Sequence, residues 1–336
     1  MNKEYVIEQE VPHMTAKATV EVSVVIPIYN EEQTVPLLHE ALHAALDDHS
    51  CTWEVIFVDD GSRDGSLDAL EALAADDPEH TRVVALRRNF GQTAAISAGI
   101  DYSTGEIIVL MDGDMQNDPA DIPMLLDKLN EGYDVVSGWR INRQDTFITR
   151  TLPSRIANGL ISRVTGVHLH DYGCSLKAYR REVLRGFRLY GEMHRFIPAY
   201  AGYVGAKIVE VPVRHHPRKH GKTNYGLERT VKVILDLFTV KFLSGFSNKP
   251  IYLFGTPGIM FMGLGSVGLF YLLLRKLIFL GGIADSPIFL ISVMLFLMGF
   301  QSILMGLIAE MVARTYHESQ SKPIYNVRYV VRGDQE

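Results

Sequence analysis

The sequence predicts a doubly wound α/β domain with a mostly parallel sheet, followed by two helices that cross a membrane. Three observations support this. Short β-branched runs alternate with segments of helical length in the N-terminal part of the chain. These runs are apolar almost throughout, as expected for strands that are covered on both faces. Two long uncharged segments lie near the C-terminus.

Five short apolar runs are the expected strands, at residues 22–29, 54–60, 82–88, 107–114 and 134–138. Helical patterns separate the first four, near residues 33–46, 66–75 and 93–102. This alternation favours a parallel sheet with helices on both faces. Ligands bind such sheets beyond the carboxyl ends of the strands, where this sequence is polar. No G-x-G-x-x-G follows the first strand, which argues against a nicotinamide or flavin cofactor.

Residues 251–274 and 286–309 are long runs without a charge. A helix of about 24 residues spans about 36 Å, against a hydrocarbon core of roughly 30 Å. A pair of buried core helices is the alternative, but apolarity on all sides and several small residues favour two membrane spans. Lysine and arginine are more numerous in the segments that flank the two spans than in the connector between them. This predicts that both chain ends lie on the cytosolic side of the plasma (inner) membrane.

Residues 228–248 precede the first span and are apolar around most of a helix. Their narrow polar stripe predicts an amphipathic helix in the membrane interface, with a helix packed on the sheet as the alternative. The remaining parts are then an N-terminal tail (1–20), a cytosolic α/β domain (21–227) and a cytosolic C-terminal tail (310–336). Residues 323–332, within that last tail, alternate like an edge strand, which could pair with its own domain or with a neighbouring chain.

Composition limits the classes of function. The net charge of −6 argues against a nucleic-acid binder, although basic residues concentrated between Arg140 and Lys241 predict a local anionic partner. Cys51 and Cys174 are the only cysteines, and the N-terminus has no stretch like a signal peptide. Both features indicate a reduced, cytosolic domain without a disulfide. Cys174 fits a small packed residue better than a nucleophile.

Three aspartates, Asp112, Asp114 and Asp118, follow the fourth expected strand. On an extended backbone, residues two apart point to the same side, so Asp112 and Asp114 would repel each other without a cation. A hard divalent ion, Mg²⁺ or Mn²⁺, accepts such oxygen ligands, and Gln116 adds a side-chain oxygen. Because surface turns are rich in aspartate, a D-x-D pattern alone is weak evidence for a metal site. Its position at the end of a predicted strand strengthens that evidence.

The first two strand ends allow two interpretations each. Asp59 and Asp60, in VDDGSRDGS, suit a strand–turn–helix junction, and they also suit hydrogen bonds to a base or ribose. Tyr29, in PIYNEE, belongs either to a turn or to a platform for a nucleobase.

Several segments together resemble a known family. VVIPIYNEE, VDDGSRDGS, RRNFGQTAAISAGI and DGDMQNDP look like the succession of motifs in family 2 glycosyltransferases of the GT-A fold. SGWRINRQD, DYGCSLKAYRR, MHRFIPA and RHHPRKHGKTNYG look like its polyprenyl-phosphate branch, which includes dolichyl-phosphate mannose synthases and bacterial undecaprenyl-phosphate glycosyltransferases with two C-terminal spans. The resemblance covers residues 22–331.

The resemblance implies roles for the matching residues. Those that would hold the nucleotide are Pro27, Tyr29, Glu31 and Asp60. Those that would bind the metal are Asp112, Asp114 and Gln116. Those that would contact phosphates are Arg140, Arg150, Ser154 and Arg218, assisted by Lys222. Asp171 would lie near the sugar or acceptor, with an ion pair to Lys177 or Arg180 as the alternative.

Two departures from the family's pattern stand out. Gly113 makes DGD where many relatives have DAD, at the cost of some local rigidity. GKTNY replaces the commoner GESKY or GQSKY, which leaves the role of Lys222 open.

Two basic segments suit phosphate binding. Arg150 and Ser154 are four apart and share one face of a helix, where the arginine fork could grip a phosphate. Arg155 and Arg163 are expected to lie on a solvent-exposed basic face and not to bind phosphate. Residues 215–225 form a basic, glycine-containing loop, whose histidine spacing is poor for zinc.

The implied reaction is inverting transfer of a sugar from a nucleotide-sugar to undecaprenyl phosphate, for a cell-envelope glycan. A UDP-sugar is expected, with glucose first, GlcNAc or an amino-arabinose derivative next, and GDP-mannose as a further alternative. The acceptor is already an anion near neutral pH, so a general base is less necessary than for a hydroxyl. Arg218 is expected to neutralise the leaving diphosphate.

Two rival functions remain. A processive polysaccharide synthase shares the fold, but it usually carries Q-x-x-R-W, and neither Trp53 nor Trp139 lies in that setting. A membrane-anchored scaffold with an inactive transferase-like domain is the other, and the acidic motif and basic loop argue against it. Strand exchange through the tail predicts a homo-oligomer.

Overall fold

A computed structural model describes residues 20–141, 158–159, 161–163, 165–185, 189, 193–217, 251–279, 286–319 and 324–331. The expected tail at 1–20, apart from its last residue, and the expected interfacial helix at 228–248 lie outside this set. The chain divides into two compact units, Met1–Leu237 with Pro323–Glu336, and Phe238–Lys322.

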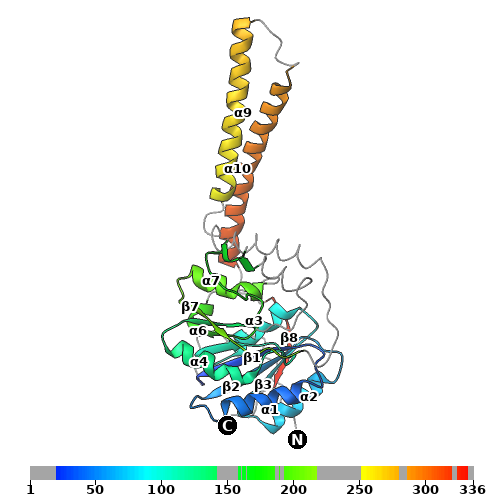
Figure 1. Cartoon of the computed structure of the whole chain (residues 1–336). Helices are drawn as coiled ribbons and strands as arrows, with labels where there is room; N and C mark the ends of the chain where they lie inside the picture. Colours follow the sequence, from blue (N-terminus) through cyan, green and yellow to red (C-terminus); the bar gives the residue numbers. More distant parts are fainter. Residues whose placement is uncertain are drawn as a thin grey trace. The chain divides into compact units, whose positions relative to one another are not determined.

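The first unit is built on an eight-stranded sheet (Figure 1). In order across the sheet, the strands are β7 (Ile208–Pro212), β5 (Val135–Trp139), β6 (Lys177–Arg180), β4 (Ile107–Leu110), β1 (Val22–Ile28), β2 (Trp53–Asp59), β3 (Thr81–Leu86) and β8 (Val327–Val331). β4, β1, β2 and β3 are parallel neighbours, whereas β6 runs antiparallel to β4 and β5. The mixed but mostly parallel α/β fold is confirmed, and β6 and β7 are additions to the predicted strands.

β4 ends at Leu110, and not at residue 114 as predicted. Residues 113–114 form a turn, and Met115 has a left-handed φ of 57°. The argument that Asp112 and Asp114 share one side of an extended strand is therefore wrong. Both aspartates lie beyond the strand, where side chains no longer alternate.

Helices cover both faces of the sheet (Figure 1). The helices of this unit are α1 (Val35–Leu46), α2 (Ser66–Asp76), α3 (Gln92–Tyr102), η1 (Pro119–Asp121), α4 (Ile122–Asn130), α6 (Arg181–Leu184), η3 (Met193–Phe196) and α7 (Ile197–Tyr203). α1, α2 and α4 share a core with alternate strand residues such as Val24 and Phe57. α3 covers the opposite face, where Gly99 lies directly against Val25 and Val58 and a side chain at 99 would have no room.

β8 belongs to this sheet although it follows the C-terminal helices in the sequence. It pairs antiparallel with β3. Two tyrosines fasten it: the hydroxyl of Tyr329 donates to Glu71 on α2 at 2.6 Å, and that of Tyr325 donates to Asp101 on α3 at 2.7 Å. Of the two pairings that the sequence left open, the structure shows the one within the chain's own domain.

The second unit is a pair of long helices, α9 (Ile251–Phe279) and α10 (Pro287–Ser319). Their backbones approach closely where Gly258 meets Gly299, because neither residue has a side chain to hold them apart. The glycines thus act as the small-residue contact expected of packed membrane helices.

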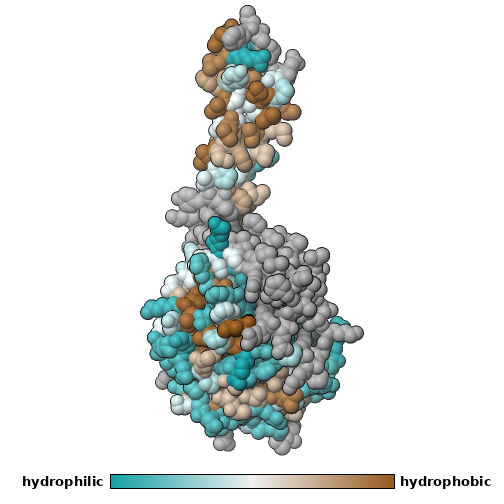
Figure 2. Space-filling view, in the orientation of Figure 1, coloured by the Kyte–Doolittle hydropathy of each residue, from teal (hydrophilic) through white to brown (hydrophobic). Residues whose placement is uncertain are grey.

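The segments Phe254–Ile278 and Pro287–Ala309 are long and apolar enough to cross a membrane. Most of their large apolar side chains are exposed, and hydrophobic residues dominate the surface of this helix pair in Figure 2. Buried core helices would not show such exposure, and an apolar surface of this extent is rare on soluble proteins. The helix pair therefore indicates a membrane protein.

Candidate functional site

The carboxyl ends of β1, β2, β3 and β4 meet at one edge of the sheet, because these strands are parallel neighbours. Hydrogen bonds connect the loops that leave this edge. The amide of Asn30 donates to Ser62 Oγ at 3.0 Å, and Asn30 Oδ1 accepts from the Arg63 amide at 2.8 Å. Asn30 has a left-handed φ of 56°, which asparagine tolerates better than most residues. These contacts lock the loop after β1 to the loop after β2.

Asp60 connects the loop after β2 to the loop after β3. Its two carboxylate oxygens accept from the amides of Phe90 at 2.7 Å and Gly91 at 2.9 Å. Burial raises the pKa of Asp60, and these two hydrogen bonds oppose the rise. Gly61, with a φ of 68°, turns so close to the Arg88 backbone that a side chain there would collide with it.

Asp59 lies beside Asp60 and is also almost fully buried, with 1% and 3% of the two residues exposed. Its carboxylate accepts from the amides of Gly61 at 3.2 Å and Ser62 at 3.3 Å, while burial raises its pKa. The structure thus shows both aspartates as turn-forming residues. Their contact with a base or ribose stays a prediction.

The other three expected nucleotide-binding residues lie at the end of β1. Tyr29 is 41% exposed, so its ring is accessible to a ligand, and Pro27 is half-buried. The amide of Glu31 donates to Ser66 Oγ at 2.8 Å, and its carboxylate accepts from Thr34 Oγ1 at 2.9 Å. All three therefore flank the loop that Asn30 and Ser62 hold in place.

Asp112 and Asp114 lie in the loop after β4, and both are half-buried. Asp112 Oδ1 accepts from Gln92 Nε2 at 2.6 Å, and Asp114 Oδ1 accepts from the Gln116 amide at 3.2 Å. Carboxylates on a partly exposed loop are the donor set that Mg²⁺ or Mn²⁺ prefers. Sequence analysis missed Gln92, although its place directly after the third strand end puts it at this edge.

The basic loop begins alongside this acidic loop. The amide of His216 donates to the carbonyl oxygen of Gln116 at 2.8 Å, and His215 forms an antiparallel β-bridge with Asn117. The chain that leads toward Arg218 is thus anchored, two residues earlier, on the D-x-D segment.

Arg214 also holds the basic loop against the acidic loop, and the sequence analysis did not predict this role. Its guanidinium lies 3.1 Å from Asp118 and 2.8 Å from Asp121, and its amide donates to Asp121 at 2.7 Å. Burial raises the pKa of Asp118, but hydrogen bonds from Ala120 and His216, together with the charge of Arg214, outweigh it and lower that pKa. The third aspartate of the acidic segment thus holds the basic loop.

Asp171 forms a bidentate ion pair with Arg140, with Nε at 2.7 Å from Oδ2 and Nη2 at 2.9 Å from Oδ1. The two side chains are only 3% and 12% exposed. Burial lowers the pKa of Arg140, but the hydrogen bonds and charge of Asp171 outweigh this and raise it. Arg180, an alternative partner in the sequence analysis, instead donates to backbone carbonyl oxygens, including that of Leu129.

Cys174 is buried, and burial raises the pKa of its thiol to about 11. Such a thiol is neutral near pH 7, which fits packing and not nucleophilic attack. Both Cys51 and Cys174 are free. The remaining expected phosphate ligands lie outside the described residues, and they are Arg150, Ser154, Arg218 and Lys222.

Comparison with known proteins places these features in a family. The family model described as glycosyl transferase family 2 matches residues 23–187. The chain is 45% identical over 315 residues to a dodecaprenyl-phosphate galacturonate synthase of Rhizobium johnstonii, a match that covers 93% of each chain. It is 37% identical over 312 residues to an undecaprenyl-phosphate 4-deoxy-4-formamido-L-arabinose transferase of Aeromonas hydrophila, covering 93% of this chain and 94% of that relative.

One solved structure supports the fold. Glucosyl-3-phosphoglycerate synthase of Mycobacterium tuberculosis, crystallised with Mn²⁺, UDP and phosphoglyceric acid, matches with a TM-score of 0.50 at 20% identity. The match covers 67% of this chain and 78% of that one. The sheet edge described above and the sequence relationships agree, and the chain belongs to the family 2 glycosyltransferases.

Proposed function

We propose that the protein transfers a sugar, with inversion, from a UDP-sugar to a polyprenyl phosphate at the cytosolic face of the plasma membrane. The observation that carries the proposal is the 2.8 Å hydrogen bond between His216 and Gln116. It brings a cationic loop and an acidic loop to one sheet edge, where departure of a diphosphate needs both a metal and positive side chains. The names of the two relatives, which specify dodecaprenyl and undecaprenyl phosphate, support this acceptor class.

The residues at this edge have distinct proposed roles. The residues that bind the nucleotide are Pro27, Tyr29, Glu31, Asp59 and Asp60. Asp112, Asp114 and Gln116 would hold Mg²⁺ or Mn²⁺, whose charge would offset that of the leaving diphosphate. The residues that contact phosphates are Arg218, Arg150, Ser154 and Lys222. Arg140 would also contact phosphate, and Asp171 would position its guanidinium through their ion pair.

The membrane arrangement supports the same acceptor. β3 precedes α9 and β8 follows α10, yet both strands pair in one sheet. If the two helices span the membrane, they therefore cross it as a hairpin, with both ends of the chain on one side. We place the α/β domain (21–227) in the cytosol and the amphipathic segment (228–248) in the interface, where it positions the domain at headgroup depth.

The donor sugar is the finer part of the proposal. Glucose is the expectation from the sequence, whereas the relatives are named for galacturonate and 4-deoxy-4-formamido-L-arabinose. Donors whose sugar carries a carboxylate or a formamide group therefore have to be tested together with the glucose donor.

The test is transfer of radiolabelled sugar into a butanol-extractable lipid by the purified full chain. The assay contains undecaprenyl phosphate, Mn²⁺ and, in turn, UDP-glucose, UDP-galacturonate, UDP-GlcNAc, the UDP-formamidoarabinose derivative and GDP-mannose. One UDP-sugar is expected to label the lipid, and EDTA is expected to abolish labelling. Transfer from none of them would favour the inactive scaffold, and many sugars per lipid would favour a processive synthase.

A further inference from the structure

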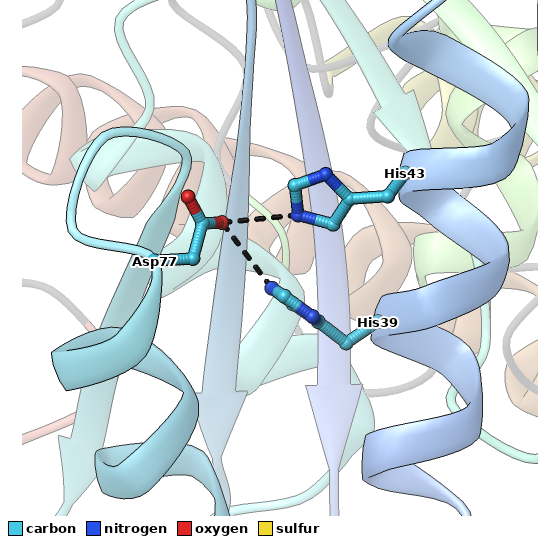
Figure 3. Close-up of side chains that lie close together, drawn as sticks. All are labelled: His39, His43 and Asp77. Carbon is cyan, nitrogen blue, oxygen red and sulfur yellow. Dashed lines mark hydrogen bonds and ion pairs between the residues drawn. The ribbon is translucent and has the colours of Figure 1, made fainter.

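Histidine and aspartate side chains gather at the edge of the sheet opposite to the D-x-D loop. α1 returns the chain to the amino ends of the strands, and the segment after α2 leads into β3 there. Figure 3 shows His39 and His43 on successive turns of α1, both directed at the carboxylate of Asp77. In the part of the chain that the structure describes, these three are the one group of His, Cys, Asp or Glu residues whose ligand atoms all lie within 4.8 Å of one another.

We propose that His39, His43 and Asp77 bind a Zn²⁺ ion. The Nε2 atoms of both histidines lie 3.2 Å from the same oxygen, Oδ2 of Asp77. Ligands of a tetrahedral zinc at bond lengths of 2.0–2.2 Å lie about 3.3 Å apart. Each histidine nitrogen is therefore already as far from the carboxylate oxygen as two ligands of one zinc ion would be, and all three donor atoms lie within 4.8 Å of one another. Residues 39–43 read HEALH, which puts both histidines on one face of α1 at a spacing that is typical of zinc sites.

The contacts around the three ligands provide a second observation. The Nδ1 of His43 lies 2.9 Å from Asp47 Oδ2, so a neutral His43 would donate there and turn a bare Nε2 toward Asp77. The other oxygen of Asp77 lies 2.9 Å from His80 Nδ1, and the His80 ring stacks on Trp53. Ligating histidines commonly donate their second N–H to a carboxylate, and ligating carboxylates are commonly hydrogen-bonded in turn. Both arrangements are present here.

One carboxylate oxygen lies in contact with three polar groups. Asp77 Oδ2 contacts His39, His43 and the hydroxyl of Thr81, which donates to it at 2.9 Å. Zn²⁺ would lie between the rings and the carboxylate, with both Nε2 atoms and Asp77 Oδ2 as its ligands.

The three proposed ligands are partly accessible to solvent. The side chains of His39, His43 and Asp77 are 11%, 26% and 17% exposed, so the cluster is neither sealed nor fully solvated. A water molecule could complete four-coordination. Because nitrogen donors select zinc over magnesium, this site would differ in metal preference from the oxygen ligands near Asp112.

The test measures Zn²⁺ bound by the untagged full chain in detergent, by equilibrium dialysis and elemental analysis in excess Mg²⁺. One zinc per chain is expected, together with a higher melting temperature. His43→Gln is expected to lower the affinity at least tenfold, and Asp47→Asn, which leaves all three ligands, by about 10–100-fold.

Matched controls separate this site from others. His168→Gln removes an exposed histidine elsewhere, and Asp112→Asn alters the D-x-D loop; both should keep one zinc. Loss of zinc in Asp112→Asn, or equal binding by His43→Gln and the unchanged chain, would overturn the proposal. So would the absence of zinc binding in a chain that melts normally. None of these results bears on sugar transfer, so the two proposals fail independently.

Discussion

Gln92 Nε2 lies 2.6 Å from Asp112 Oδ1, so the first residue of α3 reaches across to the loop after β4. This hydrogen bond orients one of the two carboxylates proposed to hold the metal. Residues that orient a metal ligand commonly affect metal affinity by 10- to 100-fold.

Gln92→Ala is therefore expected to raise the Mn²⁺ concentration needed for half-maximal turnover by about tenfold or more. Gln92→Glu should raise it further, because it sets a second carboxylate against Asp112. The measurement is a Mn²⁺ titration of sugar transfer. Gln33→Ala, at an exposed position, serves as the control. An unchanged titration in both Gln92 variants would remove this residue from the site.

Asp114→Ala is expected to reduce metal-dependent transfer by on the order of 100-fold, because the leaving diphosphate loses a metal ligand. The exposed Asp68 on α2 offers a matched control, and Asp68→Ala should retain activity. Turnover is compared at saturating Mn²⁺ and UDP-sugar. Normal metal-dependent turnover in Asp114→Ala would show that the ion is held elsewhere.

Arg214→Ala is expected to lower turnover about tenfold or more while costing only about 0–1 kcal/mol of stability. The guanidinium is 53% exposed, so its ion pairs with Asp118 and Asp121 contribute little to folding. They do hold the start of the basic loop against the acidic loop. Initial rates and thermal melting are measured together, with Arg185→Ala at an exposed position as the control. A variant with full activity would show that the loop needs no such anchor.

Asp171→Asn is expected to lower the free energy of unfolding by about 3–5 kcal/mol, because it leaves the buried charge of Arg140 without its partner. Combining it with Arg140→Gln should recover part of the loss, since neither buried charge then remains. Denaturant unfolding in detergent compares the wild type, Asp171→Asn and the double variant. If Asp171→Asn impaired transfer at unchanged stability, Asp171 would instead contact the sugar or acceptor.

The raised pKa of the buried Cys174 thiol predicts that the protein loses stability at alkaline pH. Burial raises the pKa of its thiol from 9.0 to about 11. Between those pH values the unfolded chain loses the thiol proton and the folded chain keeps it. The stability that this difference in pKa contributes to the folded state is therefore complete below pH 9 and disappears as the pH rises to 11. The expected loss is about 2–3 kcal/mol. Denaturant unfolding of wild type and Cys174→Ala at both ends of this range measures it, and a pH dependence identical in the two proteins would contradict the prediction.

Local patterns were enough to predict much of the fold. β1, β2 and β3 are continuous apolar runs between turn residues, and their observed ends lie within two residues of the predicted ones. β6 escaped prediction because Lys177 and Arg180 interrupt its apolar pattern, although Lys177 is buried in the structure. β4 was predicted too long because Asp112 and Asp114 alternate as strand residues do, whereas the chain turns at Gly113.

The α/β class, the apolar helix pair and the acidic strand end could all be predicted from the amino-acid sequence, because each depends on residues close together in the chain. The contacts between residues far apart in the chain became visible in the folded structure alone. It paired Arg140 with Asp171, set His216 against Gln116, placed β8 beside β3 and brought Asp77 to His39 and His43. Those contacts depend on the order in which the strands assemble, and no periodicity along the chain encodes that order.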